Sequence, residues 1–139
     1  MGNLITVETV INSTIENVWD KWINPDDIIK WNNASEDWHT PKAENNLKVG
    51  GKFLYRMEAK DGSMGFDFWG TYTQIKPFER IECTLGDGRK MNVFFKKDNG
   101  KTIVTETFEA ESENSIELQQ LGWQAILNNF KKYVEQKTI

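Results

Sequence analysis

Residues 114–136, at the end of the chain, constrain the fold most, because they have the pattern of a long amphipathic helix. Positions on one side recur at the three-and-four spacing of a helical face. This face comprises Leu118, Leu121, Gly122, Ala125, Ile126, Asn129, Phe130 and Tyr133. At about 100° per residue, Asn129 falls near the middle of the apolar arc. A carboxamide in such a place needs a polar partner or a ligand.

Upstream of this helix, two hairpin signals predict a mostly antiparallel sheet. Asp61-Gly62 separates expected strands 52–59 and 64–75, and Asn99-Gly100 separates 89–96 and 102–110; such dipeptides favour tight hairpin turns. The first turn predicts the cross-strand pairs Phe53 with Gly70, Tyr55 with Phe68, Met57 with Phe66, Leu54 with Trp69 and Arg56 with Asp67. The second predicts Phe95 with Val104, Val93 with Glu106 and Met91 with Phe108. Aromatic side chains therefore share one face, and Glu106 lies on an apolar face.

Outside these hairpins, three further strands are predicted at residues 4–11, 37–40 and 80–85. Ser13 and Glu16 have the spacing of a capping box, which predicts a helix that ends at Asn24. Asn24 then caps a second short helix that includes Trp31. The order of elements indicates an α+β fold, in which the long terminal helix lies across a curved sheet.

Composition narrows the classes of protein. At 139 residues the chain fits one domain, residues 1–139. A net charge of −4, with both signs interspersed, argues against a nucleic-acid partner. Neither a signal-peptide pattern nor a run of about 18 apolar residues is present, so we expect a soluble cytoplasmic protein with no membrane partner. The single cysteine, Cys83, permits no intrachain disulfide and reads as a small buried hydrophobe.

Several motifs resemble the SRPBCC superfamily of START and birch-pollen-allergen-like domains, specifically its branch of activator of heat-shock-protein-90 ATPase homologues. They are Val18-Trp19 with Pro25 to Trp31, Ala43 to Leu47 with Val49-Gly50-Gly51, Phe66 to Tyr72, and Gly122 to Leu127. The resemblance covers essentially the whole chain and implies a helix-grip fold with a deep cavity between sheet and helix. In different relatives, this cavity is used for lipids, hormones or polyketides, or has no known use. Two departures are Thr14, where proline is common, and Glu106, where an aliphatic residue is usual.

The inward aromatic face meets the terminal helix, and periodicity alone allows either a solid core or a hollow one. The resemblance favours a hollow, because ligand sites are concave, mostly apolar and sparsely polar. The predicted ligand-binding residues are Trp38, Phe53, Tyr55, Met57, Phe66, Phe68, Tyr72, Met91, Val93, Glu106, Phe108, Leu118, Gly122, Ile126 and Asn129.

Two polar residues are placed on apolar faces by independent reasoning: Glu106 by the register of its hairpin, and Asn129 by its angle around the terminal helix. A buried carboxylate is costly, so Glu106 is expected to protonate easily or to bond Asn129, Tyr55 or a ligand. An ordinary core pair and a one-residue register error are the alternatives. Our hypothesis is that the two residues orient the polar end of an apolar ligand.

We therefore expect a domain that binds a small apolar molecule. One rival is a polyketide cyclase-like or hydratase-like enzyme in which Glu106, Tyr55 or His39 moves a proton. The other is a cochaperone-like modulator of the heat-shock-protein-90 ATPase, which the family resemblance suggests. No metal-ligand spacing or cofactor motif is present. We expect a monomer or a weak homodimer that uses Trp69 and Leu54.

Overall fold

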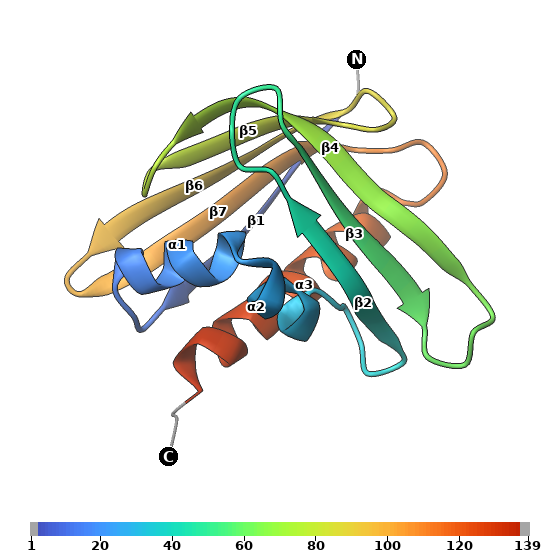
Figure 1. Ribbon diagram of the computed structural model, residues 1–139, viewed down its shortest axis with the longest axis horizontal. Helices are drawn as coiled ribbons and strands as arrows, with labels where there is room; N and C mark the ends of the chain where they lie inside the picture. Colours follow the sequence, from blue (N-terminus) through green and yellow to red (C-terminus); the bar gives the residue numbers. More distant parts are fainter. Residues whose placement is uncertain (1–2, 137–139) are drawn as a thin grey trace.

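The structure, a computed structural model, describes residues 3–136 and has the predicted α+β architecture (Figure 1). Its elements are β1 (Leu4–Ile11), α1 (Ile15–Ile23), α2 (Pro25–Trp31), β2 (Trp38–Asn45), β3 (Lys52–Ala59), β4 (Gly65–Lys76), β5 (Arg80–Leu85), β6 (Lys90–Asp98), β7 (Lys101–Glu109) and α3 (Ile116–Glu135). Seven antiparallel strands form one curved sheet in the order β1-β7-β6-β5-β4-β3-β2. Figure 1 shows α1, α2 and α3 on the same, concave side of this sheet.

Both predicted hairpin registers are confirmed. Tyr55 pairs with Phe68 across β3 and β4, and Val93 pairs with Glu106 across β6 and β7. Gly62 at the first turn and Gly100 at the second both have positive φ, as tight hairpin turns require. The inner faces of β3 to β7 are therefore built as the register arithmetic predicts.

Two local predictions differ from the structure. The capping box is wrong: Thr14, not Ser13, caps α1, because the helix begins one residue later at Ile15. The Thr14 hydroxyl accepts from the backbone N–H of Asn17 at 3.2 Å. The strand predicted over 37–40 continues to Asn45, because a register shift between His39 and Lys42 allows Pro41 to sit within an edge strand. The predicted Asn24 cap on α2 is confirmed.

The long helix α3 covers the open edge of β1, which would otherwise present unpaired backbone groups. The carboxamide of Gln124 donates to the carbonyl of Glu8 at 3.1 Å and accepts from its N–H at 3.4 Å. Further along, the ammonium of Lys131 donates to the carbonyl of Val10 at 2.5 Å. Polar side chains that the amphipathic pattern assigned to solvent thus hold α3 against the sheet.

This docking rotates α3 away from the predicted apolar face. Leu121 is 68% exposed, so the prediction that it faces the core is wrong, and Leu118, at 57%, lies at the rim of the cavity rather than in the core. The buried positions are Phe130, as predicted, and Gln119, Leu127 and Val134, which the predicted face did not include. The rotation follows from the contacts with β1, which take up one flank of the helix. No helix within residues 3–136 has both the length and the hydrophobicity needed to cross a membrane.

The solid part of the core lies where α1, α2 and the second half of α3 meet. The ring of Phe130 lies 4.9 Å from that of Trp22 and 4.7 Å from that of Trp31, in edge-to-face geometry. The two indoles stack on each other at 5.0 Å. This cluster fills one end of the space between the sheet and α3, and the other end remains open.

Candidate functional site

A cavity of about 370 Å³ lies between the inner face of the sheet and α3. Its size falls within the range of roughly 300–1,000 Å³ that is common for small-molecule sites. Trp22 and Trp31 close one end. Most predicted ligand-binding residues line it, namely Phe53, Tyr55, Met57, Phe66, Phe68, Tyr72, Met91, Val93, Glu106, Leu118, Gly122 and Ile126.

Two predicted aromatic residues lie beside this wall rather than on it. Trp38 is half-buried at the start of β2 and contacts Phe66, with ring centroids 6.0 Å apart. Phe108 is fully buried, because the indole of Trp123 stacks on it at 3.7 Å and 15°. Trp123 therefore takes the place in the wall that the register assigned to Phe108.

Asn129 also lies outside the cavity wall. Its Nδ2 donates to the carbonyl of Trp31 at 2.9 Å and to Oδ1 of Asn33 at 3.0 Å. The carboxamide thus ties α3 to the segment after α2. The expectation that it bonds Glu106 is wrong, because the rotation of α3 turns Asn129 toward the helices and not toward the sheet.

Glu106 is the buried acidic group of the cavity. It is 4% exposed and projects from the inner face of β7, with Val7 and Val93 beside it on the neighbouring strands. No side chain within residues 3–136 forms a hydrogen bond with its carboxyl, so the expected bond to Tyr55 is not made. Burial raises its pKa to about 8, so the group is mostly neutral at pH 7.

The phenols and the thiol of the inner wall are also held neutral. Burial raises the pKa of Tyr55 well above its usual value, and the charges of Tyr72, Cys83 and Glu106 add to the effect. Burial, with a contribution from Glu106, raises the pKa of Cys83 to about 12, which fits the predicted inert buried thiol. The hydroxyl of Tyr72 donates to Oδ1 of Asn45 at 2.5 Å.

His39 does not lie with these groups. Its side chain is 43% exposed on β2, and its Nε2 lies 3.9 Å from Oε1 of Glu58. The structure therefore separates His39 from Glu106 and Tyr55, and these three candidates for proton transfer do not form one site. The sequence around His39 has no clear hydrophobic periodicity, so it could not predict on which side of the sheet this histidine lies.

The structure adds several wall residues that the sequence reasoning missed. They are Trp22, Trp31, Asn32, Ile81, Cys83, Arg89, Glu111, Asn114, Gln119 and Trp123. Alternation along residues 80–85 puts Ile81 and Cys83 on one side of the strand, and helical spacing gives Trp22 and Trp31 an inward side. The signal was present for these residues, but it did not distinguish a cavity wall from solid core.

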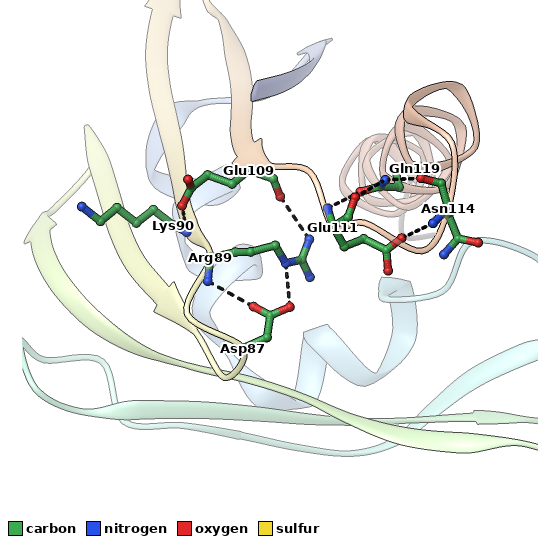
Figure 2. A network of polar contacts seen from close by, with 7 residues as sticks. All are labelled: Asp87, Arg89, Lys90, Glu109, Glu111, Asn114 and Gln119. Carbon is green, nitrogen blue, oxygen red and sulfur yellow. Dashed lines mark hydrogen bonds and ion pairs between the residues drawn. The ribbon is translucent and has the colours of Figure 1, made fainter. Parts of the chain in front are cut away.

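A polar network orders the loops at the open end of the cavity. Figure 2 shows Arg89 between Asp87 and Glu109: its Nε donates to Oδ2 of Asp87 at 2.7 Å and its Nη1 to the carbonyl of Glu109 at 3.1 Å. On the β7–α3 loop, the carboxamide of Gln119 accepts from the N–H of Glu111 at 2.9 Å and donates to the carbonyl of Asn114 at 2.8 Å. This network fixes the start of α3.

The rim beside this network is apolar. Phe66 and Leu118, the two wall residues that carry large exposed apolar side chains, are 47% and 57% exposed. These two side chains are therefore the part of the apolar wall that is most exposed to solvent.

Comparison with known proteins places the chain in a family. The model of Activator of Hsp90 ATPase homolog 1-like proteins matches residues 12–135. An AHSA1-like protein from Aeromonas hydrophila, solved by NMR, is 48% identical with a TM-score of 0.90 over 96% of this chain and 92% of that one. A protein from Cytophaga hutchinsonii is 52% identical with a TM-score of 0.84, over 96% and 93% of the two chains.

A crystal structure from Chromobacterium violaceum has the same fold at 23% identity, with a TM-score of 0.86 over 97% and 99% of the two chains. No functionally curated protein is significantly similar to the chain. The predicted resemblance is confirmed: the chain belongs to the family of Activator of Hsp90 ATPase homolog 1-like proteins, within the SRPBCC superfamily.

Proposed function

We propose that the chain binds a small, largely apolar molecule in the cavity between the sheet and α3. The observation that carries the proposal is the cavity itself, about 370 Å³ with rings from β3, β4, α1, α2 and α3 in its wall. Protein interiors are close-packed, and each void costs free energy in proportion to its volume. Retention of this much space supports a use for it, and SRPBCC folds commonly bind ligands.

Native mass spectrometry of protein isolated gently from its own host tests the proposal directly. We expect an additional mass that survives desolvation and is released by unfolding. The same protein after unfolding, extraction and refolding is the control.

A cavity-blocking variant gives a second test. A Cβ placed at Gly122 meets nothing within 4 Å, and Gly122 lines the cavity. Gly122→Leu should therefore fill open space without a clash, and it removes a residue that weakens helices by about 1 kcal/mol. With 2-ethylnaphthalene as the probe in equilibrium dialysis, we expect the original protein to bind and Gly122→Leu to lose at least tenfold in affinity.

Gly122→Ala is the matched control, because one methyl group leaves most of the space free. It should bind the probe nearly as the original protein does. Equal binding by Gly122→Leu, or no binding by any of the three proteins, would contradict the proposal.

One observation favours an enzymatic alternative. A carboxyl group with a pKa near 8 in an apolar wall suits general acid–base chemistry at neutral pH, and the phenol of Tyr55 lines the same cavity. Turnover of a candidate substrate that is pH-dependent and lost in Glu106→Gln would support it. The cochaperone alternative rests on the description of the family, and a change in the ATPase rate of Hsp90 on addition of this protein would support it.

A further inference from the structure

We propose that Glu106 is a polar subsite inside the cavity, which selects ligands that carry one neutral acceptor oxygen, a carbonyl or hydroxyl, on an apolar body. The inference rests on the proposed function and adds the chemical class of the ligand. An apolar ligand body suits the cavity, because aliphatic and aromatic side chains make up most of the cavity wall.

The Glu106 carboxyl is buried and has no hydrogen-bond partner among the described side chains around it. It lies midway along β7, is 4% exposed, and has aliphatic side chains opposite it on β1 and β6. A buried polar group without a partner costs about 1–3 kcal/mol. Because the carboxyl borders the cavity and forms no hydrogen bond with the side chains of residues 3–136, a ligand group is the partner that the cavity can supply.

The groups that face Glu106 decide its protonation state. The other ionisable residues of the cavity wall are Tyr55 on β3, Tyr72 on β4, Cys83 on β5, Arg89 before β6 and Glu111 before α3. The wall residues of α1, α2 and α3 carry no ionisable side chain.

Arg89 is the one basic residue in this wall, and its guanidinium is already bonded to Asp87 and the carbonyl of Glu109. No wall cation is therefore free to stabilise a carboxylate, and a neutral carboxyl donates one hydrogen bond. The raised pKa of Glu106 agrees with this geometry.

A second donor faces the same space. The phenol of Tyr55 comes from β3, across the concave sheet from β7, and both Tyr55 and Glu106 line the cavity. Both are neutral at pH 7, and both can donate. Two neutral donors in an apolar cavity suit an acceptor oxygen better than they suit a cation or a bare hydrocarbon.

The test compares two probes of nearly equal shape, 2-acetylnaphthalene and 2-ethylnaphthalene, by equilibrium dialysis at about pH 6.5 and pH 9.5. We expect the ketone to bind about tenfold more tightly at the lower pH, the factor that one hydrogen bond to a buried donor provides. The preference should shrink at pH 9.5, where Glu106 ionises and loses its donor.

Two substitutions of Glu106 distinguish the effect of its hydrogen-bond donor from the effect of its charge. Glu106→Leu should reduce the preference for the ketone to the part that Tyr55 alone supplies, and it should keep or improve binding of the hydrocarbon. Glu106→Gln keeps an N–H donor and cannot ionise, so part of the preference should remain and no longer depend on pH. Glu117→Gln, on the exposed side of α3, is the matched control and should behave as the original protein. Circular dichroism checks that each variant is folded.

The outcomes distinguish this inference from the proposed function. Binding of both probes with equal affinity, or a ketone preference that is undiminished in Glu106→Leu, overturns the polar subsite and leaves the apolar cavity in place. If 2-(aminomethyl)naphthalene binds more tightly than the ketone, and its affinity increases with pH as Glu106 ionises, the subsite selects a cation and not an acceptor oxygen. Failure of both naphthalene probes to bind overturns the subsite and the proposed function together.

Discussion

An unpaired carboxyl in the wall of the cavity makes the stability of the whole chain depend on pH. The pKa of Glu106 is about 8 in the folded protein and near 4.5 when unfolded. Between these values the folded state holds a proton that the unfolded state has lost. The contribution of Glu106 is therefore fully present below about pH 4.5 and is lost as the pH rises to about 8.

We predict that Glu106→Gln removes this loss. Its free energy of unfolding should be close to that of the original protein near pH 5 and should exceed it by roughly 4 kcal/mol near pH 9. Urea unfolding of both proteins at the two pH values measures the difference. Glu117→Gln should change neither value, and a Glu106→Gln variant that is less stable at pH 9 would mean that the carboxylate has a partner.

The carboxamide of Asn129 is the other polar group that the sequence singled out, and its bonds in the structure assign it to stability. We predict that Asn129→Ala lowers the free energy of unfolding by about 1–3 kcal/mol, because it removes the bonds to Asn33 and one of the two donors to the carbonyl of Trp31, which keeps only the N–H of Asn33. Asn128→Ala, at an exposed neighbouring position, should cost well under 1 kcal/mol. Affinity for 2-ethylnaphthalene should be nearly unchanged in folded Asn129→Ala. A loss of affinity larger than tenfold would mean that Asn129 contributes to the ligand site after all.

At the level of elements, the strands were predictable and the rotation of α3 was not. Turn chemistry and cross-strand pairs act over a few residues, so the register of β3 with β4, and the inward position of Glu106 on β7, follow from local sequence. The docking of α3 depends on β1, more than a hundred residues earlier. Gln124 and Lys131 appear solvent-facing until that edge is considered, and this is why Leu121 was wrongly placed in the core.

In the hairpin of β3 and β4, the neighbours of Gly70 leave no room for an added methyl group. A Cβ at Gly70 would lie 2.8 Å from the ring of Phe53 and 2.9 Å from the carbonyl of Thr84. We predict that Gly70→Ala lowers the free energy of unfolding by about 1–3 kcal/mol, measured by urea unfolding.

A double-mutant cycle locates the cause of that cost. In a Phe53→Leu background the cost of Gly70→Ala should fall by at least about 0.5 kcal/mol, because part of the clash is with the ring. The rest should remain, since the carbonyl of Thr84 stays in place. Gly122→Ala, where the new methyl group meets open space, is the control and should stabilise α3. Strict additivity of Gly70→Ala and Phe53→Leu would exclude the ring as the cause.

Across the whole molecule, the side walls of the cavity were within reach of sequence reasoning, whereas its two ends were not. Alternation along β3 to β7 places Tyr55, Cys83 and Glu106 on one face. The closed end depends on how α1 and α2 pack Trp22 and Trp31 against α3, and the open end on loop contacts such as Arg89 with Asp87. These are long-range or loop contacts, which hydrophobic periodicity does not encode.

The distribution of the wall over five strands and three helices makes ligand binding a property of the intact fold. Because unfolding destroys the site, a ligand that binds only the folded state at about 100 times its Kd should raise the free energy of unfolding by about 2.7 kcal/mol. For 2-ethylnaphthalene we predict that the midpoint of urea unfolding rises while the slope stays constant, since the same surface is exposed on unfolding. Gly122→Leu should unfold at a midpoint that the probe does not change. An equal shift in Gly122→Leu would place the probe on the outer surface of the protein, and a changed slope would mean that part of the cavity wall unfolds separately.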